Sequence, residues 1–360
     1  MEYTNRIAVL LVRSVLCWVA ALMFIPSSAW ATANCTANYS SFTLTLPPTV
    51  AVPRDLPNGS MLTAWSLSTS KNDYWTCIVS GNVYTGTYFE AAGITTGGPT
   101  TYTASYQGVS FEVYRTNLPG VGMAMGGYVI PNSLPEGPRT FSKLGRQWNM
   151  NGTVYNGGQL IVALVKIGDI TPGTVAGTIA QALSWQTLTP PPGGDVLSAG
   201  VIDFSMTPVV VTVLTCQTPD VTVPMGIQGP ADLPSIGPSP NKVASFNLSL
   251  NNCPGGSPVA GTSAGQIHNI QYRIDPSSGT VSGYNNVAAL SSNPAAGGVG
   301  IQLYDSTGAV FPFATYRTLN PFDSANGGDY TMPMTARYYR TGALSAGPAN
   351  STMTMTVLYQ

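Results

Sequence analysis

Alternation of apolar and polar residues, without any sustained helical period, most constrains the fold of this 360-residue chain. Side chains alternate between the two faces of a strand, so a period of two predicts strands, whereas helices repeat every 3.6 residues. The pattern is clearest in residues 349–360, where Met353, Met355, Val357 and Tyr359 share one face. We therefore predict an all-β protein whose C-terminal strand has a nearly pure apolar face.

This C-terminal strand has two interpretations. It can be the ordinary edge strand of a complete sheet, or it can border a site from which a neighbouring strand is missing. The alternation is equally compatible with both, because any edge strand leaves one row of N–H and C=O groups unpaired. The remainder of the chain has to decide between them.

The first 31 residues are typical of a secretory signal peptide. Arg6 and Arg13 are basic, residues 14–25 are apolar, and Ala29 and Ala31 provide the small residues of a cleavage site. We expect cleavage after Ala31 and export from the cytoplasm. An uncleaved membrane anchor is disfavoured, because the apolar run is shorter than the ~20 residues that span a bilayer.

Composition narrows the class of protein. Charged residues make up 8% of the chain, and no basic patch suggests binding to nucleic acid. The 39 Gly and 29 Pro residues are scattered between alternating segments, which indicates turns rather than disorder. This profile is typical of an exported β protein whose polarity comes from hydroxyls and amides.

Four of the five cysteines lie outside the signal peptide, and exported proteins retain disulfides. Four cysteines allow three pairings. We favour Cys35 with Cys77 and Cys216 with Cys253, because each loop then closes within one expected domain. A zinc site is disfavoured because the cysteines are far apart and His268 is the single histidine. We expect no metal and no cofactor.

Residues 32–214 and 216–360 are expected to form separate β domains. In the first, strands are predicted at 41–46, 74–79, 109–114, 159–167 and 201–214, the last one interrupted at Pro208. In the second, they are predicted at 220–224, 243–250, 267–274, 300–304, 309–313, 329–338 and the C-terminal stretch. Many short strands separated by turns suggest sandwiches or barrels.

Residues 216–360 carry features that are weak singly and specific together. They are Cys216, the run Phe246–Cys253, Gly298–Leu303, Ala336–Gly342, Gly347 and the terminal Val-Leu-Tyr-Gln. With them this segment resembles the pilin domain of chaperone–usher fimbriae. The resemblance implies an incomplete immunoglobulin-like sandwich, whose missing last strand is lent by a periplasmic chaperone and then by an adjacent subunit. The residues expected to contact that strand are Gly347, Met353, Met355, Val357 and Tyr359.

An ordinary fimbrial subunit begins with a short extension that it donates to its neighbour. Here residues 32–214 stand in that place, so we expect a chain that accepts a strand and donates none, at the fibre tip. The layout resembles two-domain tip adhesins such as those of type 1 fimbriae. The resemblance implies a lectin-like sandwich or jelly roll first, an outer-membrane usher as a partner, and a host glycan or protein receptor.

Two segments contain residues that suit sugar binding, since sugars are held by planar amides and carboxylates beside an aromatic face. The candidates are Asn72, Asp73, Trp148, Asn149, Asn151 and Tyr155. The alternative is that the aromatic residues belong to the core and the amides form turns, an interpretation that we favour for Trp75. The pocket motif of the mannose-binding relatives is absent after Cys77 and after Ile167, so mannose is not the expected ligand.

Catalysis has little support in the sequence. The G-x-S-x-G match at residues 261–265 lies in a loop, whereas a nucleophile elbow needs a strand-to-helix turn. Glu90, Glu112 and Glu136 are isolated acids without a glycosidase setting. We expect a non-enzymatic binding protein. The alternatives are a structural, fibre-initiating subunit without receptor binding and a secreted glycan-acting enzyme.

Overall fold

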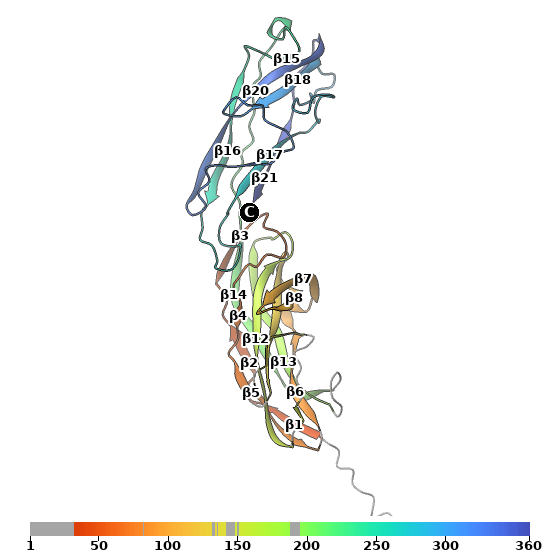
Figure 1. Cartoon of the computed structure of the whole chain (residues 1–360), viewed down its shortest axis with the longest axis vertical. Coiled ribbons are helices and arrows are strands. Elements are labelled where there is room, and N and C mark those ends of the chain that lie inside the picture. Colours follow the sequence, from red (N-terminus) through yellow and green to blue (C-terminus); the bar gives the residue numbers. More distant parts are fainter. Residues whose placement is uncertain are drawn as a thin grey trace, which may run out of the picture.

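The computed structural model describes residues 32–81, 83–131, 134, 136–141, 148–149, 151–187 and 195–360. The predicted signal peptide lies outside these residues. Two β-rich halves are stacked end to end in an elongated molecule (Figure 1). Apart from the short 3-10 turns η1 (Gly93–Thr95) and η3 (Pro230–Asp232), regular structure in the described part is strand, which confirms the all-β prediction. No helix in this part is long and apolar enough to cross a membrane.

The N-terminal half, residues 32–214, is built from two sheets. The first has the order β1 (Thr32–Ala37), β5 (Lys71–Ser80), β12 (Gly152–Lys166), β9 (Val121–Pro131), β8 (Val109–Arg115) and β7 (Pro99–Tyr106). Two short strands flank it, with β4 (Ser66–Leu67) paired to β12 and β10 (Arg139–Thr140) paired to β9. The predicted strand at 159–167 is the buried part of β12, and its central position explains the uninterrupted apolar run.

The second sheet of this half covers the first. Its order is β11 (Trp148–Asn149), β6 (Tyr84–Ala91), β13 (Gly173–Thr187), β14 (Asp195–Leu214) and β2 (Ser41–Leu44), and β3 (Thr49–Pro53) also pairs with β14. Pro208 does not end β14. The register shifts there, from Val209 opposite Val175 to Met206 opposite Gly177, so the proline lies at an irregularity that accommodates its missing N–H.

The core of the N-terminal half lies between these sheets. Trp75, Phe89 and Phe204 are fully buried in it, which confirms the core interpretation of Trp75. The disulfide between Cys35 and Cys77 joins β1 to β5 at directly opposite positions. It is one of the two disulfides that the sequence favoured, and the Cys216–Cys253 bond is the other.

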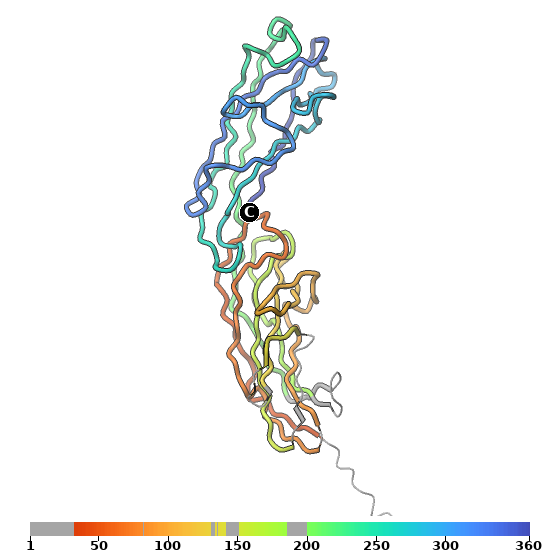
Figure 2. Tube along the Cα trace, in the orientation of Figure 1, coloured from red at the N-terminus to blue at the C-terminus, as the bar shows by residue number. Residues whose placement is uncertain are grey.

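The C-terminal half, residues 216–360, has a second, separate core between two smaller sheets. One has the order β15 (Gly237–Pro238), β20 (Gly327–Ser345) and β16 (Ala244–Pro254), with β18 (Gly297–Tyr304) also paired to β20. The other has the order β19 (Arg317–Thr318), β17 (Ile270–Pro276) and β21 (Met353–Tyr359). Strand β21 ends at the junction between the halves, where the C-terminus is marked in Figure 2.

Two predicted strands of the C-terminal half are wrong. Residues 220–224 pair with no strand in the described structure, although their side chains alternate. Residues 309–313 make one isolated bridge, between Val310 and Tyr304, after a tight turn at 305–308. Pro312 has no N–H with which to extend that bridge into a ladder. Alternation defines two faces of an extended segment, but it does not supply a partner strand.

Candidate functional site

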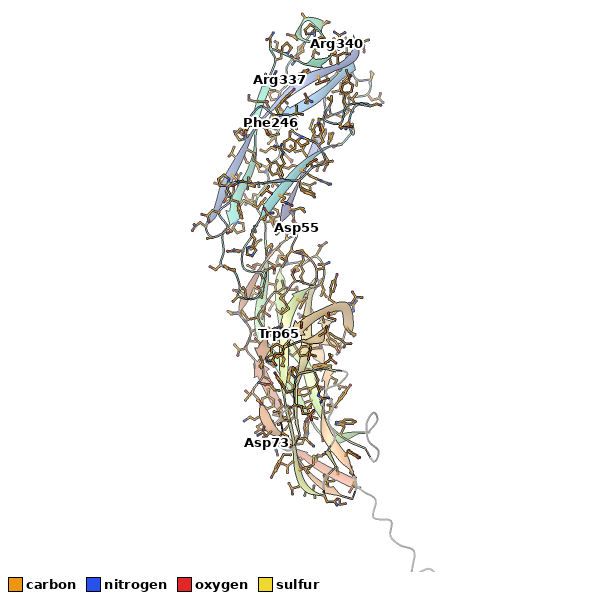
Figure 3. All side chains as sticks on the ribbon, viewed as in Figure 1. Asp55, Trp65, Asp73, Phe246, Arg337 and Arg340 are labelled. Atoms are coloured by element: carbon orange, nitrogen blue, oxygen red, sulfur yellow. A yellow bond between two sulfur atoms is a disulfide. The ribbon has the colours of Figure 1, made fainter. Side chains whose placement is uncertain are left out.

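A surface depression of about 620 Å³ lies in the N-terminal half, lined by Tyr39, Ser70, Lys71, Asn72, Asp73 and Tyr155. Asp73 marks its place in Figure 3, well away from Asp55 at the junction between the halves. Three of the six predicted ligand-binding residues therefore line one pocket. Tyr155 comes from β12 and the Asn72–Asp73 pair from the neighbouring strand β5.

A change of register places these side chains. Trp75 of β5 pairs with Asn156 of β12, but Lys71 pairs with Gly158, so β5 contains two more residues over this interval. Such bulges bend a strand and redirect its side chains. Gly157 allows the two strands to approach at this point, because a Cβ on it would lie 2.0 Å from the carbonyl oxygen of Lys71. The glycine pair 157–158 thus shapes the pocket wall.

Both polar and aromatic groups line the depression. The Tyr39 hydroxyl donates to Oδ1 of Asp73 at 3.2 Å. The Lys71 ammonium lies 5.1 Å from the centre of the Tyr39 ring, within the range of a cation–π contact. Tyr155 keeps 41% of its surface exposed. The pocket therefore combines a carboxylate, an amide, a cation and exposed aromatic surface, the groups that recognise hydroxyls and C–H faces of a sugar.

The backbone of the other predicted residues lies in a different part of the half. Trp148 and Asn149 form β11, which pairs with β6 in the opposite sheet, and their side chains lie outside the described residues. Asn151 is exposed in the turn before β12. The candidate segment around Trp148 is thus divided between the two sheets, and of its described side chains Tyr155 lines the pocket.

Tyr39 and Lys71 are pocket residues that sequence reasoning missed. The predicted Cys35–Cys77 disulfide could have indicated Tyr39 through the strand register that it implies. Antiparallel pairing with Cys35 opposite Cys77 continues with Ala37 opposite Trp75. The same register, extended by two residues, brings Tyr39 to Asp73.

A second candidate site is the free edge of β21. This strand pairs with β17, and its even-numbered residues exchange the hydrogen bonds, as Gln360 does with Asn269. In an antiparallel pair the intervening residues direct their N–H and C=O groups to the other side. Met353, Met355 and Val357 therefore direct backbone groups to an edge that no strand of the described structure covers.

Apolar side chains on three segments of the C-terminal half are incompletely buried. Each packs against the core of the C-terminal half and remains partly exposed. They are Val223, Met225, Phe246, Leu248, Met353 and Met355. A complete sandwich buries its inward-facing side chains on every strand, so this partial exposure fits a core with one covering element missing.

Gly347 lies in a depression of about 490 Å³ before the start of β21. Leu233, Val299 and Leu344 contribute apolar surface to it. A Cβ on residue 347 would lie 2.8 Å from the backbone nitrogen of Ala296, so the close approach of two backbone segments requires glycine here. The depression has room for an apolar side chain of an added strand.

Tyr359 closes the other end of β21. Its side chain is buried, and burial raises the pKa of its hydroxyl, an effect that the neighbouring Cys216 backbone opposes. Of the five residues predicted to contact an added strand, Met353, Met355, Val357 and Tyr359 share one face of β21, and Gly347 lies before its start. Val357 and Tyr359 face the core completely, whereas the two methionines are partly open.

No three His, Cys, Asp or Glu side chains in the described part could hold a metal ion together. His268 is exposed, and its Nδ1 lies 3.1 Å from Nε2 of Gln266. The G-x-S-x-G match lies in the loop that precedes β17, without a helix after it.

Comparison with known proteins identifies fimbrial proteins as relatives of this chain. The model of the "Fimbrial protein" family matches residues 205–360. The chain is 31% identical over 190 residues to a type-1 fimbrial protein, A chain, of Escherichia coli K12, covering 52% of this chain and 98% of that one. It is 34% identical over 143 residues to a fimbrial subunit type 1 of Klebsiella pneumoniae, covering 39% and 72%.

Among solved structures, the chain aligns with the CupB6 tip adhesin of Pseudomonas aeruginosa. The identity is 15%, the alignment covers 91% of this chain and 93% of that one, and the TM-score is 0.32. At this TM-score the likeness does not bear on function.

Proposed function

The chain belongs to the family of fimbrial proteins, and from this premise we propose that it is a tip adhesin of the chaperone–usher type. Family membership points to a structural or adhesive protein rather than an enzyme. In this proposal residues 32–214 form the receptor-binding domain and residues 216–360 form a pilin domain. The protein crosses the periplasm and is displayed at the end of a fimbria on the cell surface.

The free edge of β21 is the observation that carries the assembly part of the proposal. Its unpaired backbone groups and the partly exposed methionines beside them suit an added strand with apolar residues at alternate positions. A periplasmic chaperone supplies that strand first, and an adjacent subunit supplies it in the fibre. An outer-membrane usher is the expected site of the exchange.

The order of the two halves in the chain supports the proposed tip position. Strand β14 of the N-terminal half ends at Leu214, two residues before Cys216 of the C-terminal half. The place of a free donor extension is thus occupied by a folded half with its own core. In the proposal this folded half replaces the donated extension, which favours a position at the end of the fibre.

The pocket of Asn72, Asp73 and Tyr155 is the proposed receptor site, and the proposed ligand class is a glycan. Asp73 lies well away from Asp55, which contacts the end of β21, so the two proposed activities use different surfaces (Figure 3). The polar groups of the pocket would hold sugar hydroxyls, and the exposed part of Tyr155 would stack on a C–H face.

A glycan array with the full chain, complemented by a donor strand, tests the adhesin function. Saturable binding to a defined glycan is the expected result. Binding to none of the glycans, nor to matrix proteins such as collagen, would favour a purely structural subunit. Turnover of a bound glycan would favour the enzyme alternative.

The assembly function has its own test. The full chain should co-purify with a periplasmic chaperone of the same fimbrial system, and a synthetic strand of alternating apolar residues should raise its refolding yield. A chain that refolds equally well without any added strand would overturn the open-edge proposal.

A further inference from the structure

The loop after β3 crosses the junction between the halves and meets the end of β21. The backbone N–H of Asp55 donates to the carbonyl oxygen of Tyr359 at 3.0 Å. The N–H of Tyr359 donates in return to Oδ2 of Asp55 at 2.9 Å. Asp55 thus satisfies both outward-facing backbone groups of Tyr359, as a residue of a neighbouring strand would.

Arg54 covers the next position along the same edge. Its guanidinium donates to Oδ2 of Asp55 at 2.9 Å and also to the carbonyl oxygen of Val357. It lies 4.8 Å from the centre of the Tyr359 ring. Among the described residues, no hydrogen-bond partner covers the N–H of Val357 or the N–H and C=O groups of Met355 and Met353 on this edge.

A buried cation holds this loop in place. Lys166 of β12 is 3% exposed, and its Nζ donates to the carbonyl oxygens of Arg54 and Leu56, each at 2.7 Å. The N–H of Arg54 donates to the carbonyl oxygen of Leu214 at 3.2 Å. Burial lowers the pKa of Lys166, and the two carbonyls provide the hydrogen bonds that its ammonium needs inside the protein.

A second contact crosses the junction on the side of β3. The N–H of Gly265 donates to the carbonyl oxygen of Ala51 at 2.7 Å. Ala264 is fully buried and packs with the core of the N-terminal half. Two separate contacts therefore fix the direction in which Arg54 and Asp55 face β21.

From these contacts we infer that Arg54 and Asp55 are part of the strand-acceptor site and act as a stop for the incoming strand. The occupant of the edge is a strand donated by an adjacent subunit, so the inference rests on the proposed assembly function. The donated strand pairs with Met353, Met355 and the N–H of Val357. It ends there, because Asp55 already occupies the pairing position at Tyr359.

Two synthetic peptides test the stop on the full chain. Both have alternating apolar residues, one reaching Val357 in the paired register and the other extending two residues further, across Tyr359. In the wild type we expect equal affinity for both, within about twofold. In the variant carrying Arg54→Ala and Asp55→Ala, the long peptide should bind about tenfold more tightly than the short one, or ~1.4 kcal/mol.

The outcomes separate the two proposals. A long peptide that gains the same affinity in the wild type and in the variant would show that there is no stop. Failure of both peptides to bind the wild type would overturn strand acceptance itself, and the stop with it. A variant that binds the short peptide as the wild type does, with unchanged circular dichroism, has kept its fold.

Amide hydrogen exchange gives a readout on the wild type alone. Exchange at Tyr359 should be slow in the complex with the short peptide, since Asp55 protects its N–H, and the long peptide should leave that rate unchanged. A rate at Tyr359 that falls about tenfold or more only with the long peptide would contradict the stop.

Discussion

Asp55 and Tyr359 lie 304 residues apart in the chain, and the backbone N–H and the carboxylate of Asp55 bond the two outward-facing backbone groups of Tyr359. The first belongs to the half that carries the surface pocket, and the second ends the strand whose edge is open. The contact therefore joins the proposed receptor-binding half to the proposed assembly site. It is made by one backbone N–H and one carboxylate, so single substitutions can probe it.

Replacing Asp55 with Ala should destabilise the junction. The Tyr359 N–H loses its acceptor and the Arg54 guanidinium keeps only the carbonyl oxygen of Val357, at a cost of about 1–3 kcal/mol in unfolding free energy. Asp55→Asn should lose less, because its amide oxygen can still accept. Asp220→Asn is the matched control, since Asp220 is exposed. Chemical denaturation measures the unfolding free energies of the three variants. Equal stability of Asp55→Ala and wild type would contradict the role of Asp55 at the junction.

Lys166→Met should lower the unfolding free energy more than the same substitution of an exposed lysine. Methionine fills a similar space but leaves the carbonyl oxygens of Arg54 and Leu56 without a donor. Each unpaired buried acceptor costs about 1–3 kcal/mol. Lys242→Met is the control, because Lys242 is exposed. Thermal unfolding that is unaffected by Lys166→Met would show that the loop does not depend on this cation.

Asp73→Asn should weaken binding to any glycan that the wild type captures by about tenfold, or ~1.4 kcal/mol. Asparagine keeps the shape but loses the charge that strengthens hydrogen bonds to sugar hydroxyls. Tyr155→Ala should weaken it similarly by removing a stacking face. Tyr316→Ala, another partly exposed tyrosine, serves as control. Full binding by both pocket variants would exclude this pocket as the receptor site.

Met355→Ser should weaken binding of a donor peptide more than it changes the stability of the chain alone. Met355 is partly exposed until an added strand covers it, so most of its burial is expected on binding. Thr354→Ser on the opposite face is the control, with unchanged affinity expected. Isothermal titration with the short peptide measures both. Equal affinities for Met355→Ser and wild type would argue against this edge as the acceptor.

Acid stability should depend on Asp305. Hydrogen bonds from the Thr307 hydroxyl and the Arg317 guanidinium lower the pKa of this carboxyl from 3.8 to about 2. A lowered carboxyl pKa stabilises the fold above about pH 4, and that stabilisation is lost as the pH falls from 4 towards 2. Asp305→Asn should therefore flatten the fall in unfolding free energy over this range. If the unfolding free energies of variant and wild type depend on pH in the same way, Asp305 does not contribute to acid stability.

Much of the architecture could be predicted because strand alternation is local. Residues 109–114 and 353–359 read as strands from their own side chains, and each is one. The disulfide pairs followed from proximity in the chain. The strand predicted at 220–224 is wrong for the same reason. Its side chains alternate, but no strand of the described structure pairs with it.

Part of the candidate pocket could be predicted from residue types in the sequence. Asn72, Asp73 and Tyr155 suit sugar binding by residue type, and two neighbouring strands bring them together. Trp148 and Asn149 have equally suitable types, yet they pair with β6 in the other sheet. Residue type indicates what a side chain can bind, whereas sheet pairing decides which side chains share a pocket.

The sequence by itself determined that the chain is β-rich, that its cysteines close local loops, and that the face containing Met355 and Tyr359 is apolar. These are properties of short segments, which hydrophobic periodicity records directly. The tertiary structure alone decided that Asp55 covers the end of β21 while Met353 and Met355 remain open. That contact depends on the docking of two halves far apart in the chain, and no periodicity in either segment encodes it.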